Sequence, residues 1–360
     1  MKKIKIDFII GKMTSGGAQR VIANLANYFA QNGHSVRIIT FIEGNAYQLD
    51  SRIERVEFHE KILFIKSSII RGFLYLLKFY LNKKNRPNII SSHIGFLGYT
   101  TIPICKIYGI NLIVSEHFNH VHQTINVERK ILWNVLYRYA DAVTILTSFD
   151  LDFFKSRSKR VIVMENPCSF DIIQNTDNPR EKVILAVGDL NRYKHKGFDN
   201  LIEIASKVLP KHKDWKIKIV GTGDEGTKYL KHLVENLGLS EQIIFSGYRN
   251  DVKELMAKSE IYILTSRYEG LPMVLLEALS QGMACISYDC ITGPADIIEN
   301  QKNGLLIPDQ NKEALIDGLE SLITNEPLRN HLKSNSSTAL NKFHIDNVGQ
   351  KWVDLINDLI

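Results

Sequence analysis

The chain has 360 residues, of which 44% are hydrophobic and 23% are charged, and its net charge is +6. This composition is typical of a soluble globular protein, and the length fits two domains of about 150 to 200 residues. No apolar run reaches the roughly 18 residues of a membrane-spanning helix. The four cysteines show neither a C-x-x-C pair nor nearby histidine ligands, so we expect reduced thiols in a cytoplasmic protein. The positive charge is compatible with an anionic partner.

The first half of the chain alternates short β-branched runs with helical patterns. Strands are expected at residues 4–10, 35–41, 87–93, 111–117 and 142–148. Strands separated by helices of ten or more residues predict a parallel sheet with right-handed crossovers. After the first strand, Gly16 and Gly17 either let the backbone approach a ligand or form only a tight turn into a helix. This helix is expected to begin at Ala18 and to end at Asn32 and Gly33.

A basic segment follows, because residues 61–115 contain no Asp or Glu. Basic and aromatic residues are interleaved there: Lys61, Phe64, Lys66, Arg71, Phe73, Tyr75, Lys78, Phe79, Tyr80, Lys83, Lys84, Arg86 and Lys106. The pattern is typical of a basic amphipathic helix, so we expect residues 64–86 to bind an anionic membrane surface. A core-packed helix with a solvated basic rim is the alternative. Nucleic acid is disfavoured because no binding motif is present.

Three histidines follow the ends of expected strands: His93, His117 and His120. Each either faces a ligand or is a buried core histidine, and none belongs to a His, Asp and Glu trio with metal-ligand spacing. Asp150 and Asp152 form an Asp-x-Asp pattern that could hold a metal-bound sugar nucleotide. This pattern is better explained as the start of the next helix, since Asp favours caps and first turns.

The series of strands restarts after a polar stretch at 161–182, which has the composition of a linker. Further strands are expected at residues 182–188, 215–221, 242–247, 261–266 and 284–289. We therefore predict an α/β protein with two Rossmann-like domains, residues 1–165 and 166–342, whose parallel sheets face each other across a central cleft. A terminal helix at about 343–360 is expected to pack back on the first domain. Ligands of such sheets bind at the carboxyl ends of the strands, so the loops there are the candidates.

Two loops of the second half carry signals for phosphate binding. Four basic side chains gather just ahead of a helix: Arg192, Lys194, His195 and Lys196. They form either a diphosphate clamp or a solvated basic loop. Gly221, Gly223 and Gly226 spell G-x-G-x-x-G between a strand and a helix, which alone favours NAD binding. That fingerprint normally follows the first strand of its domain, whereas here it follows the second.

The stretch "SRYEGLPMVLLEALSQG" carries two carboxylates, Glu269 and Glu277, around a Gly-Leu-Pro turn. Pro272 suits the first turn of a helix, and good helix formers follow it. The backbone from Gly270 to Met273 is therefore expected to form a helix N-terminus that attracts an anion. An acid beside such a site can hydrogen-bond hydroxyl groups while the amides hold phosphate. The alternative is that both glutamates are ordinary helix-start and surface residues.

Motifs along nearly the whole chain resemble those of a known family. The motifs that carry the resemblance are Gly-Gly-Ala-Gln after the first strand, "VGDL" with "KGFDNLIEIA", "IVGTGDE", "FSGYRNDV", the two glutamates, and "TGPADIIENQKNGLLIPDQN". They have the order and spacing of glycosyltransferase family 4, whose members are retaining enzymes of GT-B fold. The resemblance implies a nucleotide-sugar donor bound mainly by the second domain, an acceptor on the first domain, and no cofactor or obligatory metal.

The resemblance also implies roles for individual residues. Glu277 would hold the ribose hydroxyls, Glu269 would face the donor sugar, and Lys196 would bind phosphate. Asp189 stands where the family has an arginine, so Arg192 would supply the lost cation. His117 would lie near the C6 hydroxyl of the sugar. Together with these residues, the expected donor site comprises Gly16, Gly17, Gly188, Gly221, Gly223, Tyr248, Arg249, Gly270, Leu271, Pro272 and Met273.

The expected activity is transfer of a hexose or N-acetylhexosamine, with a UDP-sugar favoured as donor, to a glycan acceptor. Bacterial capsule, exopolysaccharide and lipid-linked oligosaccharide transferases look most similar, so we expect a lipid-linked acceptor at the inner face of the plasma membrane. Two alternatives stay open: an NAD-dependent oxidoreductase and a sugar-nucleotide-binding protein without catalysis.

Overall fold

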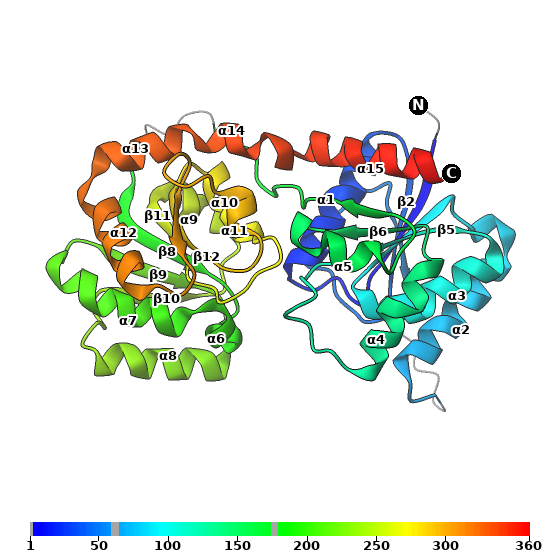
Figure 1. Ribbon diagram of the computed structural model, residues 1–360, viewed down its shortest axis with the longest axis horizontal. Helices are drawn as coiled ribbons and strands as arrows, with labels where there is room; N and C mark the ends of the chain where they lie inside the picture. The colour runs from blue at the N-terminus through cyan, green and yellow to red at the C-terminus, as the bar shows by residue number, and fades with distance from the viewer. Residues whose placement is uncertain (1–2, 59–64, 174–178) are drawn as a thin grey trace. The chain divides into compact units, whose positions relative to one another are not determined.

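The computed structural model describes residues 3–58, 65–173 and 179–360. The chain divides into two compact units (Figure 1). The first unit comprises Met1–Ser169 together with Phe343–Ile360, and the second comprises Phe170–Lys342. The border thus falls slightly after the position expected from composition.

Within the described residues, the sheet of the first unit has seven parallel strands in the order β3-β2-β1-β4-β5-β6-β7. The strands are β1 (Lys5–Ile9), β2 (Ser35–Thr40), β3 (Glu54–Glu57), β4 (Ile89–His93), β5 (Asn111–Ser115), β6 (Ala142–Ile145) and β7 (Val161–Val163). The five strands expected in this half are confirmed. The interpretation of 161–182 as linker throughout was wrong, because its first three residues pair with β6 as a short, half-buried edge strand.

Helices cover both faces of this sheet. Its helices are α1 (Gly17–Gln31), α2 (Ser68–Leu81), α3 (Gly98–Tyr108), α4 (Val127–Asn134), α5 (Leu151–Lys155) and α15 (Ile345–Leu359). Successive strand residues point to opposite faces. Phe8 of β1 accordingly contacts Phe29 of α1, whereas Ile9 packs in one core with residues of α2, α3, α4 and α5. The terminal helix α15 packs on α1, where a Cβ at Gly349 would lie 2.3 Å from the Tyr28 ring.

The helix α2 packs its apolar face on the core. Leu76 and Tyr80 are fully buried, and the Tyr80 hydroxyl donates to Asp7 at 2.7 Å. Asp7 in turn accepts from Arg37 of β2 in a buried ion pair. The core-packed alternative therefore describes α2, and the expected contact of 64–86 with a membrane stays a prediction that rests on its basic rim. Lys61 and Phe64 lie outside the described residues, and no helix among the described residues is long and apolar enough to cross a membrane.

The second unit has, over its described residues, a parallel sheet of six strands in the order β10-β9-β8-β11-β12-β13. They are β8 (Glu181–Val187), β9 (Lys216–Val220), β10 (Ile243–Gly247), β11 (Ser259–Leu264), β12 (Ala284–Asp289) and β13 (Leu305–Pro308). The five strands predicted in this half are confirmed, and β13 was missed. Because all run in one direction, their carboxyl ends lie at one edge of the sheet.

The helices in the described part of the second unit are α6 (Tyr193–Lys196), α7 (Phe198–Val208), α8 (Asp224–Asn236), α9 (Val252–Lys258), α10 (Met273–Ser280), α11 (Pro294–Ile297), α12 (Lys312–Thr324), α13 (Glu326–Ser334) and α14 (Ser336–Leu340). Of these, α7, α8, α12 and α13 contribute buried residues to one large apolar core with the sheet. Two parallel-sheet units of this kind form the α/β architecture that the sequence predicts.

Candidate active site

The central pair of the second unit is Lys196 with Glu269. These residues follow the neighbouring strands β8 and β11, and the Lys196 Nζ lies 2.8 Å from the Glu269 Oε1. The same oxygen accepts a hydrogen bond from the Ser266 hydroxyl at 2.6 Å. Burial alone would raise the pKa of Glu269, but the Lys196 ammonium and these hydrogen bonds hold it below its usual value. Glu269 is therefore a buried, ionised carboxylate beside a cation.

A close approach of two loops creates this pair. Gly197 adopts φ +67°, and a Cβ there would lie 1.9 Å from the Thr265 carbonyl oxygen. Thr265 also donates from its hydroxyl to the carbonyl oxygens of Lys196 and Gly197, at 3.1 and 2.9 Å. Only glycine fits at position 197, so the Lys-Gly motif brings Lys196 against the loop that carries Glu269.

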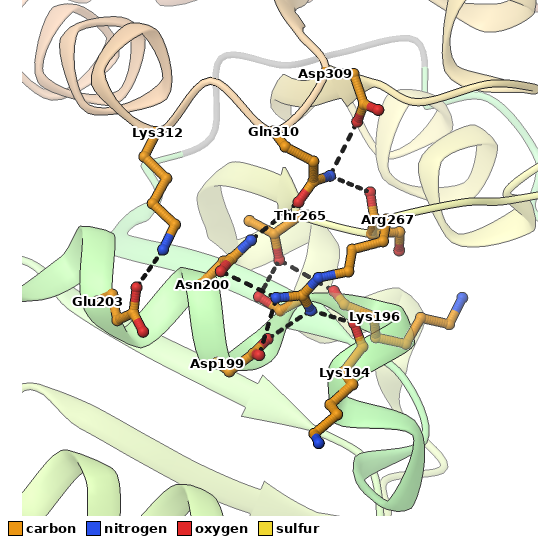
Figure 2. Close-up of polar contacts among 12 residues, drawn as sticks. Lys194, Lys196, Asp199, Asn200, Glu203, Thr265, Arg267, Asp309, Gln310 and Lys312 are labelled. Atoms are coloured by element: carbon orange, nitrogen blue, oxygen red, sulfur yellow. Dashed lines mark hydrogen bonds and ion pairs between the residues drawn. The ribbon is translucent and has the colours of Figure 1, made fainter.

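Arg267 ties three loops together behind the pair. Its guanidinium donates to the Asp199 carboxylate at 2.8 and 3.0 Å and to the Asn200 amide oxygen at 3.1 Å. Asn200 donates to Gln310, in the loop after β13, at 3.0 Å. Figure 2 shows the Arg267 guanidinium directed at Asp199 and Asn200, while the ammonium ends of Lys194 and Lys196 extend away from this cluster. Sequence reasoning missed Arg267 because only the fold brings its loop beside α7.

His195 links Arg192 to the loop of Glu269. The His195 Nδ1 accepts from the Arg192 guanidinium at 2.5 Å, and its Nε2–H donates to the Tyr268 carbonyl oxygen at 2.7 Å. Its ring stacks on Tyr268 with centroids 3.9 Å apart. Burial lowers the pKa of His195 to about 4, so the ring is neutral near pH 7 and can accept from Arg192. Arg192 thereby lies in the cation-bearing loop, as predicted, and its contact with phosphate stays a prediction.

Asp189 does not take part in this cluster of cations. Its carboxylate accepts from the Asn191 N–H at 2.9 Å and so caps the short 3-10 turn Leu190–Arg192. The residue that replaces the expected arginine thus has a local structural role at the start of the longer loop.

The helix α10 begins where the two glutamates predicted a helix start. Pro272 occupies the N-cap position and the helix begins at Met273, one residue later than expected. Gly293 adopts φ +97°, and a Cβ there would lie 2.5 Å from Pro272 and 2.7 Å from the Gly270 carbonyl oxygen. The loop after β12 is thus pressed against the turn. Glu277 lies in the second turn of α10 and is 2% exposed, which contradicts the alternative of a surface residue.

The G-x-G-x-x-G glycines are explained by packing of the chain on itself. A Cβ at Gly221 would lie 1.8 Å from the Gly188 carbonyl oxygen, and one at Gly226 would lie 1.7 Å from the Leu190 carbonyl oxygen. The loops after β8 and β9 therefore touch along this pattern.

Two predicted donor residues follow the strand β10: Tyr248 is 63% exposed, and Arg249 is paired with Asp251 at 2.5 Å.

In the first unit, the Gly16 and Gly17 turn leads directly into α1. Gly16 occupies the N-cap position, and the helix begins at Gly17 and ends at Gln31, with Asn32 as its C-cap. The Gly16 N–H donates to the Tyr47 hydroxyl, and this hydroxyl donates to the Gly16 carbonyl oxygen, both at 2.8 Å. Tyr47 thus fixes the glycine turn at the start of a 15-residue helix.

His117 lines a small hollow of the first unit with other polar side chains. The hollow is lined in part by His93, Glu116, His117, Glu165, Asn166 and Trp352. The His117 Nε2 lies 2.9 Å from the His93 Nδ1, and the His93 Nε2 lies 2.9 Å from the Ser91 hydroxyl. Burial lowers the pKa of His117 to about 4 and that of His93 well below its usual value, so both rings are neutral near pH 7.

Glu116 was missed by sequence reasoning although it directly precedes His117. Its carboxylate is 4% exposed and accepts from the Tyr137 hydroxyl at 2.5 Å and from the Trp133 indole at 3.1 Å. A carboxylate at the end of an apolar strand run was the available signal. Glu116 and His117 together give the hollow one acidic and one neutral hydrogen-bonding group.

Two of the remaining candidates, His120 and Asp150, form a pair with a local structural role. His120 lies 2.6 Å from the Asp150 carboxylate and stacks on Phe153. Asp150 stands at the N-cap position of α5, and Asp152 lies in its first turn, so the helix-start interpretation is confirmed. Across the described ranges, no group of three or more His, Cys, Asp or Glu residues is arranged to hold a metal ion.

Comparison with known proteins extends these observations. Residues 170–338 match the family model "Glycosyl transferases group 1", and residues 15–169 match "Glycosyltransferase Family 4". A Campylobacter jejuni protein named as an α-1,4-N-acetyl-D-galactosaminyltransferase acting on a diphospho-undecaprenol-linked sugar is 31% identical over 99% of both chains.

Solved structures share the fold over the whole chain. The lipopolysaccharide outer core galactosyltransferase WaaB superposes with a TM-score of 0.76 at 22% identity, covering 99% of this chain and all of that one. Anabaena HepE, solved in complex with UDP, has a TM-score of 0.80 at 17% identity and covers 99% of this chain and all of that one.

Proposed function

We propose a specific reaction for this chain, from the premise that it belongs to the group 1 and family 4 glycosyltransferases and has their GT-B fold. In this reaction a hexose or N-acetylhexosamine passes from a UDP-sugar to a lipid-linked glycan, with retention at the anomeric carbon. The named acceptor of the Campylobacter relative supports a diphospholipid-linked sugar. The UDP complex of the Anabaena structure supports a uridine donor. Cell-surface polysaccharide synthesis at the cytoplasmic face of the plasma membrane fits both.

The observation that carries the proposal is the Lys196–Glu269 pair beside the start of α10. Breaking the bond between sugar and diphosphate leaves negative charge on the diphosphate. Lys196, Arg192 and the first amides of α10 would be preorganised where that charge develops, and losing one such donor typically costs about 2.7–4 kcal/mol of barrier. Glu269, held ionised by Lys196, would accept hydrogen bonds from donor-sugar hydroxyls. Glu277, buried in α10, would hold the ribose.

The first unit supplies the acceptor side in this proposal. Its polar hollow offers neutral imidazole and carboxylate groups, which suit hydroxyls better than phosphates. His117 would contact the C6 hydroxyl of the transferred sugar, and the Gly16–Gly17 turn would lie near the phosphates. We propose that acceptor and leaving group share one face of the sugar, so retention needs no carboxylate nucleophile.

We propose a metal-independent transferase rather than an oxidoreductase. The glycine fingerprint is accounted for by contacts with the 188–191 loop. The negative charge of the donor diphosphate can be met by Lys196 and Arg192, so we propose that donor binding needs no metal.

A thermal-shift screen with UDP-, GDP- and ADP-sugars tests the donor. A ligand at 100 times its Kd stabilises the folded protein by about 2.7 kcal/mol, which gives a measurable rise in Tm. We expect a rise with UDP-sugars, and product formation when a polyprenyl-diphosphate glycan is added. A rise in Tm without turnover of any sugar nucleotide would identify a binding protein. No rise with any sugar nucleotide would contradict the assignment of the donor site.

A further inference from the structure

The helix α4 exposes an apolar stripe on the side that faces away from its core. Val127, Ile131 and Val135 are spaced by four residues, which places them on one side of the helix. Their exposed fractions are 72, 44 and 50%. The inward residues Leu132 and Trp133 are almost fully buried. Because the core already uses Leu132 and Trp133, the outer stripe is not needed for folding of the first unit.

Further apolar side chains are exposed in the segments that precede and follow α4 in the sequence. Four further large side chains are exposed there: Phe118, Val121, Ile125 and Tyr139. These residues and the stripe form what we call the α4 patch. Single exposed apolar side chains are ordinary on protein surfaces, whereas three of them on one side of a short helix form a surface that can bind a partner.

Positive charge is concentrated in the same layer of helices. Figure 1 shows α2, α3 and α4 in the first unit, and hydrogen bonds join them in that order. The Tyr108 hydroxyl of α3 donates to the Leu77 carbonyl oxygen of α2 at 2.7 Å, and the Tyr99 hydroxyl of α3 donates to the Glu128 carbonyl oxygen of α4 at 2.5 Å. All three helices pack on one core, so they cover the same face of the sheet.

The charge of this layer exceeds that of the whole chain. Residues 68–139 contain nine Lys or Arg and two Asp or Glu, Glu116 and Glu128, which gives +7 against +6 for all 360 residues. Glu116 is buried, so within these residues Glu128 is the acid at the surface, and Asp141, just beyond them, pairs with Lys106. Lys78, Lys83 and Lys84 of the basic rim are exposed beside the apolar side chain of Leu81, which is 69% exposed.

We propose that the α4 patch enters the interface of an anionic lipid bilayer while the cations of α2 and α4 contact lipid headgroups. An apolar stripe gains from burial among acyl chains, and the surrounding cations gain from a negative surface potential, so the bilayer matches both features at once. The inference rests on the proposed function in one respect, since a lipid-linked acceptor would be presented at that surface. The proposal also changes the expected role of α2, which now supplies charged contacts with lipid headgroups, while α4 supplies the apolar side chains that enter the bilayer.

A second copy of the chain fits the surface less well. In a symmetric dimer the same patch would meet itself, and the layer of net charge +7 would face an identical layer. Like charges at that distance oppose association, whereas the anionic bilayer neutralises them.

Sedimentation with vesicles tests the proposal on the full chain. Phosphatidylglycerol–phosphatidylcholine vesicles should bind the wild type, and binding should weaken with salt. Replacing Val127, Ile131 and Val135 together with Ser should lower vesicle affinity by about tenfold or more, since apolar burial drives insertion. Replacing Leu237 and Ile244 of the second unit with Ser is the matched control, because these side chains are also apolar and exposed, at 40 and 36%. This replacement should leave vesicle affinity unchanged.

Two further measurements separate this inference from the proposed function. The stripe variant should keep the Tm rise with UDP-sugar, and it should keep turnover of a short-chain, water-soluble acceptor, because the stripe lies outside the donor and hydroxyl sites. A stripe variant that binds anionic vesicles as wild type does would overturn the proposal. The proposal would also be overturned if analytical ultracentrifugation showed a dimer of the wild type that the variant does not form, because the stripe would then join two copies of the chain.

Discussion

The loop cluster around Glu269 and the hollow around His117 differ in charge although they lie at equivalent places in their sheets. Both lie at the carboxyl ends of parallel strands. The cluster in the second unit pairs a buried, ionised carboxylate with Lys196 at the start of a helix. The hollow in the first unit contains two imidazoles that burial keeps neutral. The contrast teaches that the fold selects the location of a candidate site, whereas the side chains there set its charge, and we propose that only the unit with Lys196 meets the charge of a diphosphate.

The largest expected effect is loss of activity in Lys196→Ala. The variant removes the cation next to the start of α10, and we expect kcat to fall by about 10² to 10³, as for loss of one preorganised donor. Lys194→Ala is the matched control, because that lysine lies two residues away in the same short helix α6 but its side chain is exposed, whereas Lys196 pairs with Glu269. Asp189→Ala should also lose less activity than Lys196→Ala. Steady-state kinetics measure this, and equal losses in all three variants would remove Lys196 from the mechanism.

Glu269→Ala should lower kcat by about 10²-fold with a smaller change in donor affinity. The carboxylate contacts Lys196 and would contact the reacting sugar, so its loss misplaces groups that act in the transition state. Glu269→Gln keeps the volume of the side chain and tests whether charge is needed. If kcat is unchanged and only KM rises, Glu269 binds the ground state and the assignment to the reacting sugar is wrong.

Glu277→Ala should instead weaken donor binding by about tenfold or more, as expected for a charged hydrogen bond, with kcat less affected. The ribose does not react, so its contacts stabilise ground and transition states alike. Isothermal titration with UDP measures the change. Because Glu277 is buried, the Tm of the unliganded variant is recorded as a control for folding. Unchanged UDP affinity in a folded variant would contradict the role at the ribose.

The first unit should be the more acid-sensitive because of its buried imidazoles. His117 has a pKa of about 4 in the folded chain, whereas an unfolded histidine has about 6.5. Between these values the unfolded chain binds more protons, so the free energy of unfolding falls as pH drops from 6.5 to 4 and is constant above. His117 contributes about 3 kcal/mol of that loss.

Urea unfolding at pH 7 and pH 5 measures the part of this loss that occurs above pH 5, about 2 kcal/mol. His117→Gln should reduce the acid-dependent loss, and the exposed His232→Gln should leave it unchanged. His195→Gln should reduce the loss by a similar amount, because burial lowers the pKa of His195 to about 4 as well. The same pH dependence in all three variants would show that the acid sensitivity lies elsewhere.

The sequence predicted the strands of both sheets because β-branched runs of five or more residues recur between helices. It missed β3, β7 and β13, which have four, three and four residues. Runs this short are set by pairing with a neighbour rather than by their own pattern. The helical period of α2 was visible, but whether its apolar face meets a sheet or a membrane depends on tertiary packing.

The site was predicted where motif and backbone requirement coincide. Gly197 after Lys196 and the helix start next to Pro272 are local signals; the glycine lies where expected, and the helix begins at Met273, within one residue of the expected start. Arg267 and Glu116 were missed because their partners lie 68 and 21 residues away in sequence and become neighbours only in the fold. The contact of His195 with Arg192 also depends on stacking against Tyr268, which no spacing rule contains.

The smallest expected effect is that of a chelator. If Lys196 and Arg192 meet the charge of the donor diphosphate, EDTA should change the initial rate of UDP-sugar turnover little. The sequence motif that could have bound a metal is Asp150-x-Asp152, but the Asp150 carboxylate already accepts from the His120 backbone at 2.9 Å and lies 2.6 Å from its ring. Asp152 is exposed on α5. A complete loss of activity with EDTA that Mg²⁺ or Mn²⁺ restores would break the contrast between the two units, because a metal ion would then carry the charge assigned to Lys196.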